Sequence, residues 1–168
     1  KNVADELIQN MLKNGAYLIN AAQVKQLEDV VIVWSKPKKE GEQPKRVINK
    51  DWVGRDAKKI LAQIGINVGD DIRCIICETE FSQAFVQTEL MMPILPIVRV
   101  DTFDEAVEMA VKAEHGNRHS AHLHSKNVDH MTQYAKAICT TIFVKNAPSY
   151  AGIGFNAEGW TTFTIAGP

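Results

Sequence analysis

The stretch of residues 102–146, TFDEAVEMAVKAEHGNRHSAHLHSKNVDHMTQYAKAICTTIFVKN, decides the fold class. Its first part indicates a helix, because Thr102 and Glu105 have the spacing of a capping box and apolar residues recur at helical spacing up to Gly116. Residues 120–125 indicate a strand, residues 127–138 a second amphipathic helix, and residues 140–146 another strand. This alternation of helices and strands predicts an α/β fold.

The residues upstream of this stretch repeat the alternation. We expect helices at 3–14, 20–29 and 51–65, and strands at 30–34, 72–78 and 95–101. Residues 35–50 contain two prolines, Gly41 and charges of both signs, which is typical of a solvated loop. The strands are apolar runs, as in a largely parallel sheet covered by helices on both faces. We therefore expect a single domain of this architecture over residues 1–168.

The composition is that of an ordinary soluble globular protein, with 45% apolar and 23% charged residues. A formal net charge of -1 argues against generic binding to nucleic acid or to anionic membranes. No apolar run approaches the roughly 20 residues that a transmembrane helix needs. The chain has 3 cysteines, which favours a reducing compartment over a disulfide framework.

Cys74 and Cys77 have C-x-x-C spacing, but the spacing lies inside an expected strand. Because side chains alternate along a strand, these two thiols should lie on opposite faces of the sheet. That arrangement favours core cysteines over a redox or zinc site. Cys139 follows an apolar helix, and we expect it to be buried as well.

Four of the 5 histidines lie close together, at positions 115, 119, 122 and 124. His122 and His124 share one face of the expected strand, but a zinc site needs at least a third ligand, and only His115 lies nearby. We therefore predict no metal site. His119 is different, because it follows a loop and begins the strand, where ligands and chemistry collect in α/β proteins. A histidine there can act as a general acid or base near neutral pH.

Two further features admit two interpretations each. Glu89 precedes two methionines and a proline, and it is either a surface acid or a carboxylate that accepts hydrogen bonds from a sugar diol. Residues 145–160 are rich in glycine and aromatic residues but lack a G-x-G-x-x-G dinucleotide motif. They form either a pocket-lining loop or a plain surface loop.

Nearly the whole chain resembles the CoA-acylating aldehyde dehydrogenases, above all those that act on propionaldehyde and acetaldehyde in propanediol- and ethanolamine-utilisation microcompartments. Several separate segments carry the resemblance in the family's order: VADELIQNMLKNGAYL, INKDWVGRDAKKIL, QTELMMPILPIVRVDTFDEAVEMAVKAEHGNRHSAHLHSKN, TTIFVKNAPSYAGIG and GWTTFTIAGP. The resemblance implies the catalytic α/β domain of the aldehyde dehydrogenase superfamily. It also implies NAD as cofactor, CoA as a substrate, a homo-oligomeric parent enzyme, and a location in the bacterial cytoplasm or inside a microcompartment.

In this family a cysteine thiolate attacks the aldehyde, hydride passes to NAD, and CoA takes the acyl group as a thioester, which divides one difficult reaction into two easier ones. Two residues correspond to functional positions of the family. Glu89 matches the glutamate that holds the nicotinamide ribose hydroxyls. His119, in GNRHS, matches the histidine that polarises or deprotonates either the catalytic cysteine or the CoA thiol. By the same resemblance Tyr150, Ala151 and Ile153 line the aldehyde pocket.

The resemblance also leads us to expect only part of such an enzyme. The family's nucleophilic cysteine lies just upstream of a segment that resembles residues 3–18, and this chain has no cysteine before Cys74. Motifs of the NAD-binding domain and the family's C-terminal strand are not recognised either. We therefore expect the chain to be inactive alone. The alternative is a non-catalytic binding or assembly module of the same fold, and a zinc protein is a more distant one.

Overall fold

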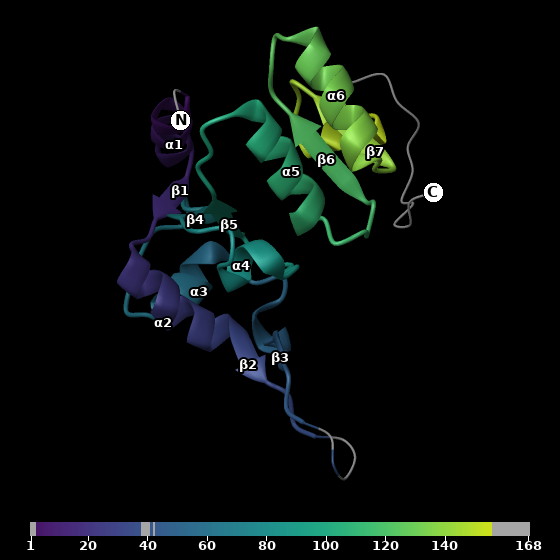
Figure 1. Ribbon diagram of the computed structural model, residues 1–168. Coiled ribbons are helices and arrows are strands. Elements are labelled where there is room, and N and C mark those ends of the chain that lie inside the picture. Colours follow the sequence, from purple (N-terminus) through teal and green to yellow (C-terminus); the bar gives the residue numbers. More distant parts are fainter. Residues whose placement is uncertain (1–2, 38–40, 42, 156–168) are drawn as a thin grey trace. The chain divides into compact units, whose positions relative to one another are not determined.

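The computed structural model describes residues 3–37, 41 and 43–155 (Figure 1). The chain falls into two compact units, Lys1–Arg99 and Val100–Pro168. Both units combine helices with parallel strands, so the predicted α/β class is confirmed. The expectation of a single domain over residues 1–168 stays a prediction.

A three-stranded parallel sheet organises the first unit. Its central strand β4 (Cys74–Glu78) pairs on one side with β1 (Ala16–Leu18) and on the other with β5 (Ile94–Ile97). In this register Ile75 lies between Tyr17 and Ile94. Ile75 and Ile76 have no exposed surface, so β4 is buried on both faces, which explains its uninterrupted apolar run.

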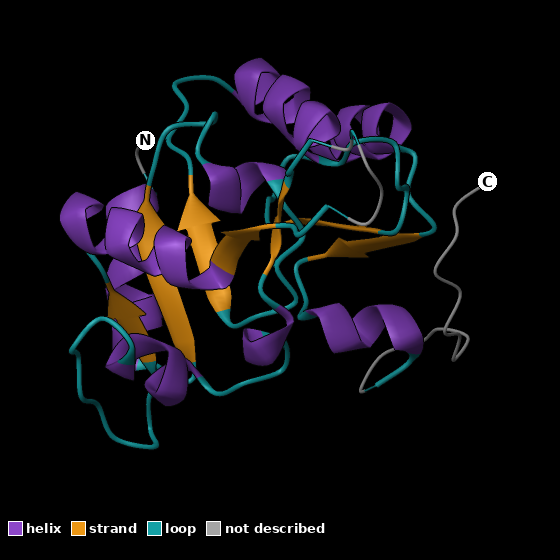
Figure 2. Cartoon of the chain, turned by 90° about the horizontal axis from the view of Figure 1, so that it is seen from below, coloured by secondary structure: helices purple, strands orange, loops and turns teal. Residues whose placement is uncertain are grey.

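Four helices cover this sheet: α1 (Ala4–Lys13), α2 (Ala21–Val31), α3 (Ala57–Ala62) and α4 (Ala84–Gln87). Ile76 packs with Ile8 of α1 on one face, whereas Ile75 packs with Leu27 of α2 and Ile60 of α3 on the other. Figure 2 shows helices alongside the strands of each unit. The prediction of helices on both faces is therefore confirmed for this sheet.

The segment expected to be one buried strand, residues 30–34, is divided between two elements. Val31 is the last residue of α2 and is fully buried, because its side chain joins the core below that helix. Strand β2 (Ile32–Trp34) begins only afterwards and pairs antiparallel with β3 (Arg46–Ile48), a strand that the sequence did not indicate. Trp34 is 67% exposed, so the prediction of a buried strand was wrong at this end. The hairpin projects from the unit beyond α2 (Figure 1), and η1 (Lys50–Trp52) follows it.

The second unit alternates α5 (Phe103–Ala113), β6 (Ser120–Leu123), α6 (Val128–Ile138) and β7 (Ile142–Lys145), followed by the 3-10 helix η2 (Ser149–Ile153). The predicted capping box of Thr102 and Glu105 starts α5, with both of its hydrogen bonds formed. Strands β6 and β7 are parallel. None of the helices in the described part of the chain is long and apolar enough to cross a lipid bilayer.

The expected amphipathic helix over 127–138 is confirmed as α6. Its first residue, Val128, is 70% exposed. Tyr134 and Ile138 are buried, and they pack with Val107 of α5 and Ala121 of β6. Residues four apart share a helical face, so this pair fixes which side of α6 meets the sheet.

Candidate functional site

His119 lies at the start of β6, at the end of the loop that follows α5. The loop leaves the helix after Ala113 through His115 and Gly116, both in the left-handed backbone region, with φ of 54° and 77°. The carbonyl of His119 accepts a hydrogen bond of 3.0 Å from the amide of Ile142, which ties this residue to β7. The side chain is exposed. The prediction that His119 marks a loop-to-strand junction is therefore confirmed.

The His119 ring has one nitrogen engaged and one available. A hydrogen bond of 2.5 Å joins Nδ1 to the Ser120 hydroxyl. Within the described part of the chain, Nε2 has no hydrogen-bond partner. A hydroxyl can both donate and accept, so Ser120 can support either neutral tautomer of the ring. Nε2 can then present either a lone pair or a proton, as a general base or general acid requires.

The neighbouring histidines are arranged differently. His122 lies on β6 next to Val144 in the register, while His124 lies one residue past the end of β6. Partial burial and then the nearby His124 lower the pKa of the His122 imidazole, so its neutral form is favoured near pH 7. Among the described residues, no group of three or more histidine, cysteine or acidic side chains is placed to hold a metal ion.

The 3-10 helix η2 carries the three residues expected to line the aldehyde pocket: Tyr150, Ala151 and Ile153. It packs on the face of β7 that carries Ile142 and Val144, because a methyl group on Gly152 would lie 2.5 Å and 3.0 Å from their Cγ2 atoms. Tyr150 is exposed and the other two residues are half-buried. Ile142 therefore links η2 to His119, through its side chain on one side and its amide on the other. Gly159 and Trp160, singled out with this segment, lie outside the described residues.

Glu89 lies in the first unit, two residues after α4. Its neighbours Phe85 and Leu90 are buried in the core, but Glu89 itself is exposed. In the described part of the chain its carboxylate has no hydrogen-bond or ion-pair partner, so both oxygens can accept hydrogen bonds from a diol. Glu89 and His119 belong to different units, and their meeting in one site stays a prediction.

A cavity of about 520 Å3 borders Met91, Met92 and Pro93, the residues that follow Glu89. Arg55, Lys58 and Arg73 contribute positive charge to its lining. Lys58 is paired with Asp70 at 3.0 Å, whereas among the described residues the side chain of Arg55 bonds only a main-chain carbonyl, that of Asp51. This arrangement could not be predicted from the sequence, because the cations lie up to 18 positions apart and look like ordinary surface charge.

A second cavity, of about 600 Å3, lies at the carboxyl ends of β4 and β5, where α/β sheets commonly bind ligands. Arg99 lines it and is held by Glu78 and by Asp5, and both contacts raise the pKa of the guanidinium. Thr79 also lines it, and its buried hydroxyl has no hydrogen-bond partner among the described residues. Two pairs within this lining are already engaged with each other: Glu78 with Arg99, and Glu28 with Gln83.

The cysteines are placed largely as predicted. Cys74 packs with the α1 side of the sheet and Cys77 with the α2 side, which confirms that they occupy opposite faces. Burial raises the pKa of the Cys77 thiol to about 11, so it is protonated and unreactive near neutral pH. Cys139 was expected to be buried, and this was wrong. It ends α6 in the left-handed region, with φ of 48°, and that turn leaves its side chain exposed.

Known proteins resemble the chain over nearly its full length. It is 48% identical to the acetaldehyde dehydrogenase (acetylating) EutE of Salmonella typhimurium, over 99% of this chain and 35% of that protein. It superposes with a TM-score of 0.87 and 53% identity on a propionaldehyde dehydrogenase from the Clostridium phytofermentans fucose utilisation bacterial microcompartment, covering 99% of this chain and 36% of that one.

A propionaldehyde dehydrogenase of Rhodopseudomonas palustris, solved with bound CoA and an acylated cysteine, superposes with a TM-score of 0.85 and 49% identity. The superposition covers 99% of this chain and 36% of that protein. The chain thus spans about a third of the length of these relatives. The model of the aldehyde dehydrogenase family matches residues 73–160, more than half of the 168 residues. The chain belongs to the aldehyde dehydrogenase family.

Proposed function

We propose that the chain forms part of the catalytic domain of an enzyme that converts a short-chain aldehyde, a nicotinamide dinucleotide and CoA into an acyl-CoA and the reduced dinucleotide. The similarity to acetylating and CoA-propanoylating dehydrogenases supports this reaction class. A bacterial location, in a microcompartment or free in the cytoplasm, belongs to the same proposal, as does assembly of the parent enzyme into a homo-oligomer. NAD is the dinucleotide that we propose.

His119 is the proposed general acid–base residue, and the geometry of its ring is the observation that supports the proposal most directly. Ser120 holds Nδ1, which leaves Nε2 to take a proton from a thiol or to return one. The hydrogen bond from the Ile142 amide to the His119 carbonyl ties the backbone of His119 to β7, and η2, which carries the proposed pocket residues, packs on β7. The thiol served by His119 is either that of the nucleophilic cysteine or that of CoA.

Glu89 is the proposed ligand of the nicotinamide ribose. Its carboxylate is exposed and unpaired among the described residues, and the nearby Phe85 and Leu90 are buried in the core. An ionised carboxylate accepts hydrogen bonds only, so it suits two vicinal hydroxyls that donate. When bound, the dinucleotide supplies the hydride acceptor. Glu89 holds and orients it.

The decisive experiment replaces His119 by Asn in the full-length enzyme that carries this chain. We expect kcat to fall by about 10²–10⁴-fold, because general acid–base help of that size is lost, while the dissociation constant of NAD stays the same. His115→Asn is the matched control, since His115 is an equally exposed histidine in the left-handed region, where Asn is tolerated. Unchanged turnover in His119→Asn would remove this residue from the mechanism.

Glu89→Gln tests the cofactor ligand. The neutral amide presents one acceptor and one donor group, so KM for NAD should rise by about ten- to a hundredfold, as expected when hydrogen bonds to a charged group are lost. Glu6→Gln, at an exposed position on α1, is the matched control. An unchanged KM for NAD would reject the assignment. The isolated chain should form no NADH from propionaldehyde, NAD and CoA, and turnover above the buffer blank would refute that expectation.

A further inference from the structure

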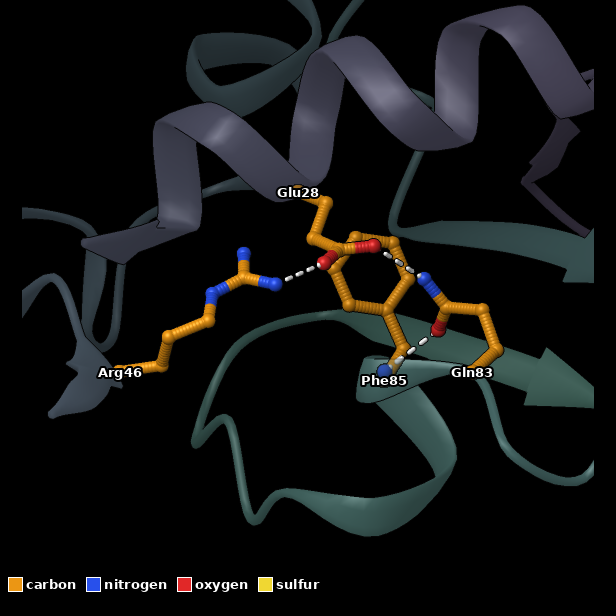
Figure 3. Close-up of polar contacts among 4 residues, drawn as sticks. All are labelled: Glu28, Arg46, Gln83 and Phe85. Atoms are coloured by element: carbon orange, nitrogen blue, oxygen red, sulfur yellow. Dashed lines mark hydrogen bonds and ion pairs between the residues drawn. The ribbon is translucent and has the colours of Figure 1, made fainter. Parts of the chain in front are cut away.

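The loop that presents Glu89 is connected to a carboxylate more than 50 residues earlier in the chain. Glu28, on α2, uses both of its carboxylate oxygens: Oε1 accepts a hydrogen bond of 2.5 Å from Nη1 of Arg46, and Oε2 accepts one of 2.8 Å from Nε2 of Gln83 (Figure 3). The Glu28 side chain is only 20% exposed. Its two partners come from β3 and from the residue before α4, so one carboxylate joins three separate segments.

Gln83 passes this contact on to the backbone of α4. Its Oε1 accepts a hydrogen bond of 2.5 Å from the amide of Phe85, which makes Gln83 the N-cap of the helix (Figure 3). The helix has only 4 residues, far below the length at which a helix is stable by itself. Satisfying the free amides of its first turn therefore matters more here than in a long helix.

Glu28 also decides which way the Gln83 amide points. A side-chain amide has an oxygen that accepts and a nitrogen that donates, and a half-turn exchanges the two. An ionised carboxylate can only accept, so Glu28 selects the orientation in which the Gln83 NH2 group points toward it. The Gln83 oxygen then points toward the amide of Phe85, as the cap requires. Without the carboxylate, the reversed amide would place two donors against each other at the start of α4.

We infer that Glu28 is a positioning residue for cofactor binding: by orienting the cap of α4, it sets the conformation of the loop from which Glu89 reaches the ribose hydroxyls. This inference rests on the proposed role of Glu89. Phe85 and Leu90 anchor the two sides of Glu89 in the core, so a change at the cap reaches this residue through one helical turn. Arg46 completes the arrangement, because it holds the other oxygen of Glu28 from the β2–β3 hairpin.

The test uses three variants of the full-length enzyme: Glu28→Gln, Gln83→Glu and the two together. Glu28→Gln leaves one side-chain oxygen for two donors, and Gln83→Glu places two carboxylates side by side. Each single variant should raise the dissociation constant of NAD roughly three- to tenfold, the effect of losing about one hydrogen bond, with kcat at saturating NAD and KM for the aldehyde unchanged. The double variant restores one donor opposite one acceptor with the direction reversed, and it should recover most of the NAD affinity.

A second comparison separates positioning from general stability. In a Glu89→Gln background, Glu28→Gln should weaken NAD binding no further, because the group that it positions is already gone. Glu108→Gln is the matched control: it removes a carboxylate that contacts a cation, Lys112, at the same 2.5 Å but on α5. This control should leave NAD affinity unchanged. If Glu28→Gln and Glu89→Gln weaken binding independently of each other, Glu28 has only a structural role and the inference is wrong.

The outcomes distinguish the inference from the proposal beneath it. Unchanged NAD affinity in Glu89→Gln overturns the assignment of Glu89 itself. Weakened affinity in Glu89→Gln with normal affinity in Glu28→Gln and Gln83→Glu overturns only the positioning role. Should a variant enzyme fail to assemble, amide hydrogen exchange of the 168-residue chain still decides. The amides of residues 85–89 should exchange faster in Glu28→Gln than in the parent chain, and equal rates would overturn the inference.

Discussion

Near the proposed pocket, Gly152 should be the residue at which adding a single methyl group destabilises the chain most. In Gly152→Ala the added methyl would lie 2.5 Å from Cγ2 of Ile142 and 3.0 Å from Cγ2 of Val144. Both contacts are far inside ordinary van der Waals separation, and both neighbours are β-branched residues with few alternative rotamers. Val144 is buried, and the amide of Ile142 is bound to the His119 carbonyl. The neighbours therefore cannot move aside, and η2 must lift from β7.

The expected destabilisation is about 1–3 kcal/mol, the usual effect of inserting a methyl group into a well-packed contact. For a unit of 60–100 residues each kcal/mol lowers the melting temperature by about 4–8 °C. Because Ile142 also holds His119, the full-length enzyme should lose turnover as well as stability. Ile142→Ala removes the nearer of the two clashing methyl groups, so the double variant Gly152→Ala, Ile142→Ala should be more stable than the sum of the two single effects predicts.

Thermal unfolding and amide exchange of residues 149–153 measure the effect. Gly69→Ala is the matched control, because its added methyl would come even closer to Oδ1 of Asp71. That atom is the end of an exposed, flexible side chain that can rotate away, so the control should change stability by less than about 1 kcal/mol. If Gly152→Ala melts and exchanges like the parent chain, η2 does not rest on β7 as described and the reasoning fails.

Three further predictions concern the core and the titratable groups. Burial and then His124 lower the pKa of His122 in the folded chain. The His122 imidazole therefore contributes stability above its unfolded pKa of about 6.5, and this stability is lost as the pH falls through the lower folded pKa. The melting temperature should drop between pH 7 and 5, and it should drop less in His122→Asn. Cys139 should react with a thiol reagent at pH 8 well before Cys77, whose pKa of about 11 keeps it protonated, and mass spectrometry of the labelled peptides would show the order. Leu27→Ala, at a fully buried position of α2, should reduce the free energy of urea unfolding by about 2–5 kcal/mol, and a loss below 1 kcal/mol would contradict its place in the core.

The sequence predicted α1, α2, α5 and α6 well because their signals are local, whereas the helix expected over 51–65 is divided into η1 (Lys50–Trp52) and α3 (Ala57–Ala62). The expected capping box at Thr102 forms with its reciprocal hydrogen bonds, and a second one forms at Asn20. Alternation along β4 correctly assigned Cys74 and Cys77 to opposite faces. In each case the decisive contacts join residues a few positions apart, so a short window of sequence contains the information.

The elements that the sequence did not indicate are the shortest ones. Strands β1 and β3 have 3 residues each and α4 has 4, too few to show a period. β1 becomes a strand because Ala16 meets Cys74 in a parallel pair, far along the chain. Val31 is likewise helical, as the last residue of α2, because its side chain is buried in the core there. This burial outweighs the preference of the β-branched run 30–34 for a strand.

The candidate site divides in the same way. His119 could be singled out because loop residues followed by a strand are visible in sequence, and family resemblance then supplied its role. Glu28 could not, since a glutamate on the polar part of a helix looks like any solvated charge until Gln83 and Arg46 are brought to it. Arg46 and Gln83 lie 18 and 55 positions from Glu28 along the chain. Candidate residues such as His119 and Glu89 can thus be picked out from short stretches of sequence, whereas the contacts that hold such residues in place are a property of the folded chain.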